Sequence, residues 1–212
     1  MKLKNKFNRV EPERRLYKLD IPVIGLTGGI ATGKSTVSKI LKDKGLAIVD
    51  ADKLVKEIYA LPGTLAFIGR EFPDVMQDGV IQFQLLRQKV FSDKTVKATI
   101  ENLIYQQLPQ TFQKAFEKLD RPKLLVYDVP LLFEKNLQDY CDVNVLVYAP
   151  RKIQRARLIT RDGHVESMAD NILDQQMDIE DKKLKAEFII DNSGTEAELS
   201  EEINQFLRQV TE

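Results

Sequence analysis

Gly28-Gly29-Ile30-Ala31-Thr32-Gly33-Lys34-Ser35 is a glycine-rich stretch that ends in Gly-Lys-Ser. An apolar run, residues 21–26, precedes it, and residues 36–44 follow with the pattern of an amphipathic helix. A strand, a glycine-rich turn and a helix in this order form the P-loop arrangement. The backbone N–H groups of such a turn and the positive end of its helix bind phosphate oxygens. The stretch therefore predicts that the chain binds a nucleoside triphosphate.

The residues of this loop have separate expected tasks. Gly28 and Gly33 allow the backbone conformations that turn successive N–H groups into one concavity. Lys34 is expected to reach the β- and γ-phosphates of ATP, and the Ser35 hydroxyl is expected to bind Mg²⁺. The residues expected to hold ATP in this way are Gly28, Gly29, Ile30, Ala31, Thr32, Gly33, Lys34, Ser35 and Thr36.

The composition is that of an ordinary globular chain. The 212 residues suit one α/β domain with an insertion, and 43% of them are hydrophobic and 30% are charged. Lys plus Arg and Asp plus Glu are equal at 32, so no net charge favours nucleic acid or an anionic membrane. One cysteine, Cys141, excludes an intrachain disulfide and is expected to be a buried, inert thiol. No apolar stretch approaches the length of a membrane span, and these features together fit a cytoplasmic enzyme.

Beyond the loop, strand and helix patterns alternate along the chain. Strands are expected at residues 21–26, 46–49, 123–129, 143–148 and 188–190. Helices are expected at residues 53–59, 151–161, 167–176 and 196–210. This alternation predicts an α/β fold with a doubly wound, five-stranded parallel sheet flanked by helices. The nucleotide-binding core is expected to comprise residues 21–60 and 123–212.

Residues 61–122 interrupt the alternation with a helical pattern and are interpreted as an insertion. Three turn signals separate helices that are expected at residues 65–72, 83–91 and 94–119. Pro109 is expected to break or kink the last of these helices. The aromatic residues expected to pack most of this insertion are Phe83, Phe91, Tyr105, Phe112 and Phe116.

Carboxylates follow two of the expected strands. Asp50 and Asp52 lie at the carboxyl end of the strand at 46–49, where open α/β sheets bind ligands. Asp52 is the candidate for orienting an acceptor hydroxyl. Asp50 is the candidate for supporting Asp52 or for binding Mg²⁺. Alternatively, one of them only caps the following helix. Asp128 ends another strand, where it either assists Mg²⁺ or caps a helix after Pro130.

A group of arginines marks the helix expected at residues 151–161. Arg157 and Arg161 are four residues apart and therefore share a helical face. Such a face over a bound triphosphate neutralises charge and excludes water, as a closing lid does. A solvated basic helix is the alternative. The lid is expected to span about residues 151–176.

Two further polar residues lie in loops near the expected site. His164, the one histidine of the chain, lies in the lid loop, where a surface role is expected rather than catalysis. Asn192 follows the last strand, where it either contacts a nucleotide base or belongs to a plain turn.

The first 20 residues carry seven basic and three acidic residues. They lack the apolar central region of a secretory signal. We interpret them as a solvated, partly disordered basic extension, with a nucleic-acid-binding arm as the alternative.

In this order, the motifs resemble those of dephospho-CoA kinases. The resemblance rests on Gly25-Leu-Thr-Gly-Gly-Ile and Gly33-Lys-Ser-Thr, Asp50-Ala-Asp, Leu86-Arg with Val90-Phe, Pro130-Leu-Leu-Phe-Glu, Arg157-Leu with Arg161-Asp-Gly and Gln176, and Ile190-Asp-Asn with Gly194. It covers residues 21–210. The chain departs from the family pattern on the acceptor side, with Tyr105-Gln106 in place of the usual His-Pro and Phe83-Gln84 in place of the usual Asp-Arg.

The resemblance implies an ATP- and Mg²⁺-dependent kinase that phosphorylates the ribose 3′-hydroxyl of dephospho-CoA, the last step of coenzyme A biosynthesis. Residues 61–122 then form the helical acceptor-binding insertion, and Asp52 matches the family's proposed catalytic base. The expected catalytic residues are Asp52, Lys34, Arg157 and Arg161. Asp52 and Arg87 are expected to contact the substrate, and Ser35 and Asp50 to bind the metal. Asn192 is expected to join the loop residues around ATP.

Other functions remain as alternatives at this stage. A P-loop kinase for another small acceptor, such as a nucleoside monophosphate, is the first alternative. The Asn-Lys-x-Asp motif of GTPases and the Leu-Ser-Gly-Gly motif of ABC-type ATPases are absent from the sequence. A nucleic-acid-binding ATPase would have to use the basic first 20 residues, against a net charge of zero. The expected partner is therefore a small molecule, with no nucleic acid and no membrane, and the expected state is a monomer or small homo-oligomer.

Overall fold

A computed structural model describes residues 1–163 and 165–212 and divides the chain into two compact units. The first unit comprises Met1–Asp50 and Asp120–Glu212, and the second comprises Ala51–Leu119. The expected nucleotide-binding elements lie in the first unit, apart from the helix after Asp50.

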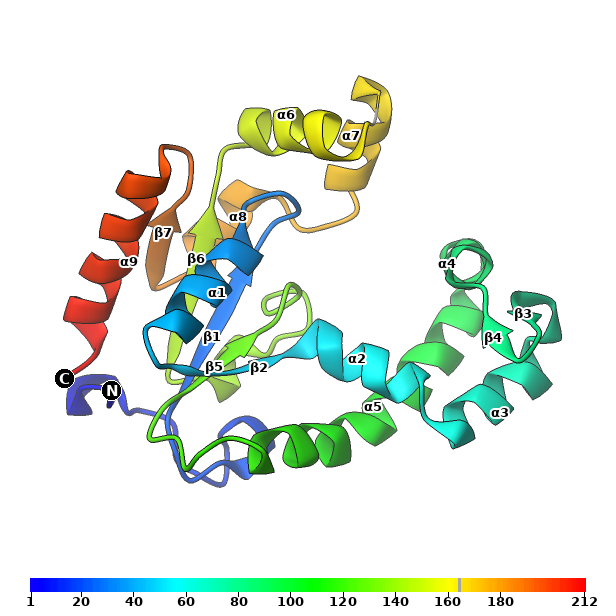
Figure 1. Ribbon diagram of the computed structural model, residues 1–212, viewed down its shortest axis with the longest axis horizontal. Coiled ribbons are helices and arrows are strands. Elements are labelled where there is room, and N and C mark those ends of the chain that lie inside the picture. The colour runs from blue at the N-terminus through cyan, green and yellow to red at the C-terminus, as the bar shows by residue number, and fades with distance from the viewer. Residues whose placement is uncertain (164) are drawn as a thin grey trace. The chain divides into compact units, whose positions relative to one another are not determined.

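The first unit is built on a parallel sheet of five strands, as the alternation of patterns predicted (Figure 1). The strands are β1 Val23–Gly28, β2 Ala47–Asp50, β5 Leu125–Asp128, β6 Val143–Tyr148 and β7 Phe188–Asp191. Their order across the sheet is β2-β5-β1-β6-β7, and every neighbouring pair is parallel. Because β1 is the central strand, the glycine-rich loop that follows it emerges at the middle of the sheet's carboxyl edge.

Helices cover both faces of this sheet. The helices α1 Lys34–Asp43 and α9 Glu196–Val210 contact each other and pack on one face through a shared apolar core. On β6, Val143, Val145 and Val147 face that core, whereas Leu146 packs with α8 Ile179–Lys185 on the other face. Successive side chains of a strand point to opposite faces, so a strand that is covered by helices on both faces needs apolar side chains on both. The seven-residue helix α8 is an element that the sequence patterns did not predict.

The second unit is helical, with a small hairpin. Its elements are α2 Ala51–Tyr59, α3 Pro62–Glu71, η3 Pro73–Val75, β3 Met76–Gln77, β4 Val80–Ile81, α4 Phe83–Ser92 and α5 Lys94–Glu117. Asp78 and Gly79 both have positive φ and form the two-residue turn of the hairpin, as favoured by an Asp-Gly sequence. The unit begins at Ala51 rather than at residue 61, because α2 packs against α5.

One expectation for this unit was wrong and another was wrong in part. Pro109 was expected to break or kink α5, and the helix continues through it without a break. Phe83, Phe91 and Tyr105 are exposed, so Phe112 is the one fully buried ring of the five aromatic residues. The core is mostly aliphatic instead: its buried members are Ile68, Phe72, Val75, Ile81, Leu86, Val96 and Ile100.

The first 20 residues are ordered against the rest of the first unit, so the expectation of a partly disordered extension was wrong. They include the short helices η1 Asn5–Phe7 and η2 Leu16–Lys18, and Leu3, Leu16 and Leu19 are buried. Leu3 forms an antiparallel bridge with Thr211, which places the two termini side by side (Figure 1). The ammonium of Lys4 donates to the carbonyls of Arg208 and Gln209 at the end of α9.

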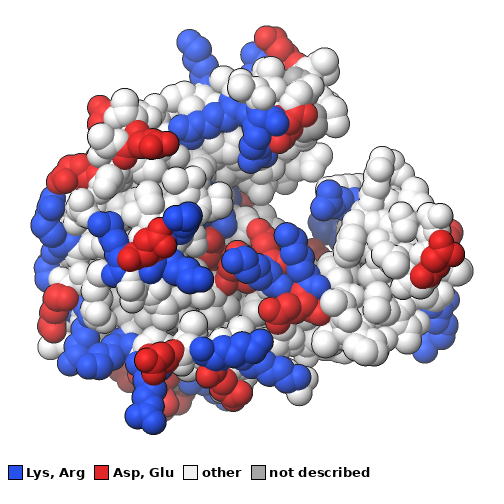
Figure 2. Space-filling model, viewed as in Figure 1, with Lys and Arg blue, Asp and Glu red and all other residues white. Residues whose placement is uncertain are grey.

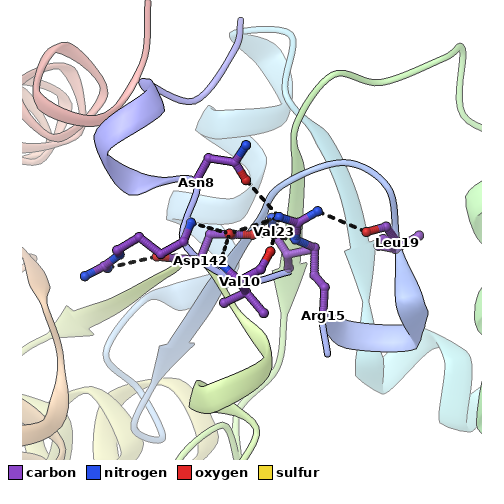
Figure 3. A network of polar contacts seen from close by, with 7 residues as sticks. Asn8, Val10, Arg15, Leu19, Val23 and Asp142 are labelled. Carbon is purple, nitrogen blue, oxygen red and sulfur yellow. Dashed lines mark hydrogen bonds and ion pairs between the residues drawn. The ribbon is translucent and has the colours of Figure 1, made fainter. Parts of the chain in front are cut away.

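A buried ion pair anchors this segment to the sheet (Figure 3). Arg15 Nε donates to Asp142 Oδ2 at 2.9 Å, and both side chains are almost fully enclosed. The Asp142 carboxylate also accepts hydrogen bonds from the backbone N–H groups of Arg9, Val10 and Val23, at 2.8–3.0 Å. The other Arg15 nitrogens donate to the carbonyl of Leu19, to Asn8 Oδ1 and to the carbonyl of Val10. Three basic residues of this segment, Lys4, Arg9 and Arg15, thus form hydrogen bonds or ion pairs within the chain.

Cys141 is buried beside Asp142, as expected of an inert thiol. Burial, assisted by the negative charge of Asp142, raises the pKa of the Cys141 thiol to about 12. Because the thiolate is the reactive form, we expect no reaction with a disulfide reagent at pH 8 in the native protein. One equivalent should react rapidly after denaturation in urea. Rapid native labelling would contradict both the burial and the pKa.

Acidic and basic side chains intermingle over the visible face, in keeping with the zero net charge (Figure 2). Among the helices of the described residues, none is long and apolar enough to span a membrane.

Candidate active site

The loop between β1 and α1 has the conformation of a phosphate cradle. Ala31 and Gly33 have positive φ, 59° and 85°, and Gly33 is the N-cap of α1. Gly28 does not have positive φ, and its importance is steric. A Cβ at Gly28 would lie 2.6 Å from Thr32 Oγ1, so the loop can fold back only on a residue without a side chain.

The amides of this loop differ in whether the protein itself supplies an acceptor. Ile30 N donates to Gln176 Oε1 at 3.1 Å and Thr32 N to the Gly29 carbonyl at 3.3 Å. For the N–H groups of Ala31, Gly33 and Lys34, no acceptor occurs among residues 1–163 and 165–212. Unpaired amides at a helix N-terminus bind anions, so the loop fits the phosphates of a nucleotide.

Two carboxylates lie at the sheet edge beside the loop. Asp50 and Asp128 are register partners at the ends of β2 and β5. The ammonium of Lys34 forms an ion pair with Asp128, whose side chain is buried. Turns rather than a helix follow Pro130, so Asp128 has no helix to cap. It serves as the partner of the loop lysine.

The residues present suit Mg²⁺ that arrives with a nucleotide. No group of three or more His, Cys, Asp or Glu within the described residues is arranged to hold a metal by itself. Mg²⁺ ordinarily uses one or two protein oxygens together with phosphate oxygens. The exposed Ser35 hydroxyl in the first turn of α1 and the Asp50–Asp128 pair are oxygen donors of that kind.

Arg157 and Asn192 both hold the backbone of the loop. Arg157 lies on α6 Arg151–Asp162 and donates to the carbonyls of Ala31 at 3.3 Å and of Asn192 at 2.7 Å. Asn192 Nδ2 donates to the Thr32 carbonyl at 2.7 Å. Three segments far apart in the sequence therefore meet at residues 31–33.

The other arginines of α6 have different partners. Arg161 forms a bidentate pair with its neighbour Asp162, at 2.7 Å for each bond, and its side chain is largely exposed. Arg151 and Arg155 pair with Asp174 and Asp170 and so connect α6 to α7 Glu166–Leu173. The structure thus brings Arg157 to the loop but leaves Arg161 exposed on α6. His164 lies outside the described residues.

Asp52 and Arg87 belong to the second unit. Asp52 lies in the first turn of α2, two residues after Asp50, and its side chain is exposed. Arg87 is exposed on α4, near Tyr59. Burial raises the pKa of Tyr59, and the positive charge of Arg87 opposes this increase. Tyr59 also packs edge-to-face on Phe83, with ring centroids 5.2 Å apart.

Comparison with known proteins identifies the family of this chain. A model of the dephospho-CoA kinase family matches residues 22–198. The chain belongs to the dephospho-CoA kinase family.

Individual relatives agree with this assignment. A dephospho-CoA kinase of Anaeromyxobacter dehalogenans is 37% identical over 191 residues, which cover 87% of this chain and 90% of the relative. The solved dephospho-CoA kinase of Campylobacter jejuni has a TM-score of 0.63 at 26% identity, covering 88% of this chain and 96% of that one. The Thermus thermophilus protein TT1252 has a TM-score of 0.82 at 26% identity, covering 91% and 99%. As a member of this family, the chain is an ATP-dependent kinase.

Sequence reasoning missed several residues around the loop of this kinase. No role was predicted for Gln154, Glu134 or Lys182, although all three lie near the loop or its neighbouring turns. Gln154 and Lys182 are also buried. Gln154 Nε2 donates to the Ala149 carbonyl at 2.8 Å. A lysine or glutamine in a polar helix looks like any surface residue in a sequence. The one available signal was the Pro130-to-Glu134 stretch, which the family resemblance included.

Gly33→Ala is expected to weaken ATP binding about 10-fold or more, because an alanine at positive φ costs roughly 1–2 kcal/mol. The new Cβ would also lie 2.1 Å from Asn192 Nδ2 and displace it from the loop. Calorimetric titration with ATP measures the change. Gly63→Ala is the matched control, since a Cβ there meets nothing within 4 Å and ATP affinity should not change. Wild-type affinity in Gly33→Ala would show that the loop tolerates another conformation.

Proposed function

We propose that this chain transfers the γ-phosphoryl group of ATP to the ribose 3′-hydroxyl of dephospho-CoA, which gives CoA and ADP. The observation that carries the proposal is the match of a dephospho-CoA kinase family model to residues 22–198. The unpaired loop amides and the lysine beside them provide the phosphate site that such a reaction needs.

In this proposal, residues 28–36 and Lys34 hold the triphosphate. Lys34 pairs with Asp128, a partner that holds its ammonium at the loop. Arg157, which already contacts the loop backbone, and Arg161 add positive charge from the lid. Positive charge that reaches the transferring group in the transition state lowers the barrier to phosphoryl transfer. Asn192 also holds the loop, through the Thr32 carbonyl.

Mg²⁺, when bound with ATP, supplies charge neutralisation at the phosphates. Ser35 and Asp50 are the residues we propose to hold it, with Asp128 beside Asp50. Asp52 is proposed to accept a hydrogen bond from the acceptor hydroxyl, orient it and take its proton. Arg87 is proposed to contact dephospho-CoA in the helical acceptor-binding segment, residues 61–122. The cytoplasm is the proposed location, which the single reduced cysteine supports.

A panel of acceptors tests this function. ADP release from ATP and Mg²⁺ would be measured with dephospho-CoA, adenosine, AMP, UMP and no acceptor, with a Lys34→Ala protein alongside. The proposal predicts ADP formation that requires dephospho-CoA and is lost in Lys34→Ala. Preference for a nucleoside monophosphate would identify a kinase for another acceptor. Equal release without acceptor would indicate an ATPase.

A further inference from the structure

Lys182 on α8 is fully buried, although lysine is almost always a surface residue. Its ammonium nitrogen lies 2.9 Å from the carbonyl oxygen of Pro130 and 2.8 Å from Glu134 Oε1. It also lies 3.5 Å from the carbonyl oxygen of Gly28. Three acceptors from two other segments therefore converge on one buried cation.

Two of these acceptors belong to residues that adjoin parts of the active site in the sequence. Gly28 is the last residue of β1, and its carbonyl belongs to the peptide that opens the phosphate-binding loop. Pro130 follows Asp128 by two residues, and its carbonyl also accepts a hydrogen bond from Thr27 Oγ1 at 3.0 Å. Since a trans peptide is planar, fixing a carbonyl oxygen also fixes the direction of the adjoining N–H group. Contacts to Gly28 and Pro130 thus constrain the start of the loop and the turn after Asp128.

The third acceptor connects Lys182 to the segment before α8. Glu134 Oε1 accepts a hydrogen bond from the Met177 N–H at 3.3 Å. The neighbouring Gln176 accepts from the Ile30 N–H, within the loop. The segment 176–182 therefore contacts the loop at its start and its middle, and the turn after β5.

The charge of Lys182 is costly to bury. Desolvation lowers the pKa of Lys182, the ion pair with Glu134 opposes this, and the nearby charge of Lys34 lowers it further. Replacement of a buried ion pair by neutral groups of similar shape often leaves stability unchanged or increased. Net stabilisation is therefore a weak explanation for this pair, and the positions of its acceptors suggest another.

We propose that Lys182 is a positioning residue for phosphoryl transfer, which fixes the phosphate-binding loop and the Asp128 turn relative to each other. The proposal rests on the proposed kinase function. Lys182 itself touches no phosphate; it acts through the carbonyl groups of Gly28 and Pro130. Its removal should allow the loop, with Lys34, to shift relative to Asp128.

The test replaces both charges of the pair at once. In Lys182→Met with Glu134→Gln, no buried charge is left unpaired, so the protein should fold. We expect kcat to fall about 100-fold, as for a misplacement of about 1 Å at a reacting group. The KM for dephospho-CoA should stay within about 2-fold, because Lys182 contacts Gly28, Pro130 and Glu134 and not the residues proposed to bind the acceptor. Calorimetry should show weaker ATP binding. Lys185→Met, an exposed lysine on the same helix, is the matched control and should behave as wild type.

A merely structural role predicts a different pattern. The melting temperature would then change, but kcat, normalised to the concentration of protein that binds ATP, and the Kd for ATP would equal the wild-type values. This result would overturn the proposal. If the double variant does not fold, Lys182→Arg provides the test, because a planar guanidinium does not match three acceptors that converge on one ammonium. A folded Lys182→Arg protein with wild-type kcat would also overturn it.

Failure of the proposed function would give a different result from failure of the role proposed for Lys182. If wild-type protein does not phosphorylate dephospho-CoA, that function is wrong, and the comparison of ATP affinities between wild type and the double variant still decides whether Lys182 positions the loop.

Discussion

Asp52→Asn is expected to lower kcat for dephospho-CoA phosphorylation about 10³-fold, which lies within the range of general-base contributions. The substitution keeps the size of the side chain but removes the negative charge that is proposed to accept the hydroxyl proton. Asp52 is exposed in the first turn of α2 and lies outside the loop that binds phosphate. The Kd for ATP should therefore stay at the wild-type value.

The measurement pairs steady-state kinetics with calorimetric titration of ATP. Glu57→Gln is the matched control, since Glu57 is an exposed carboxylate on the same helix and its loss should change neither value. An Asp52→Asn enzyme with wild-type kcat would eliminate the role assigned to Asp52. A parallel loss of ATP binding would instead place Asp52 in the nucleotide site.

Asp142→Asn is expected to destabilise the first unit by about 3–5 kcal/mol, as for removal of one partner from a buried ion pair. The Arg15 guanidinium would keep its charge without a counterion, since its side chain is only 3% exposed. The new amide group would also face N–H donors that the carboxylate now satisfies. For a chain of this size, the melting temperature should fall by roughly 6–20 °C.

Thermal melting followed by circular dichroism measures this effect, with Asp139→Asn as the control. Asp139 is exposed in the short helix η4 Gln138–Tyr140, and its substitution should change the melting temperature by about 1 °C or less. Deletion of residues 1–20 should destabilise the protein in the same direction. An unchanged melting temperature in Asp142→Asn would mean that the N-terminal segment contributes nothing to stability.

The sheet and its loop were predictable because local patterns encode them. Apolar runs separated by helical segments specified the five parallel strands, and Gly-Lys-Ser after the first run located the phosphate site. The helix expected at residues 196–210 is α9, Glu196–Val210, and a capping box at Thr195 marks its start in the structure. In each case the deciding residues are neighbours in the sequence.

The contacts that hold the loop were not predictable, because they join residues far apart. Lys182 and Gly28 are separated by 154 positions, and nothing in the sequence near Lys182 distinguishes it from Lys183 or Lys185. The prediction for residues 1–20 was wrong for the same reason. Their charges look solvated in the sequence, but the counterion of Arg15 is Asp142, 127 positions later. Phe83 and Phe91 show the converse, since hydrophobicity alone predicted burial for side chains that the helical unit leaves exposed.

The most direct test of the central claim follows the transferred group to its acceptor atom. Wild-type protein would be incubated with ATP, Mg²⁺ and either dephospho-CoA or its 3′-deoxy analogue, and products would be identified by mass spectrometry and co-elution with CoA. The proposed function predicts one phosphoryl group added to dephospho-CoA, a product that matches CoA, and no addition to the 3′-deoxy analogue. Phosphorylation of the 3′-deoxy analogue, or no CoA from dephospho-CoA, would contradict it.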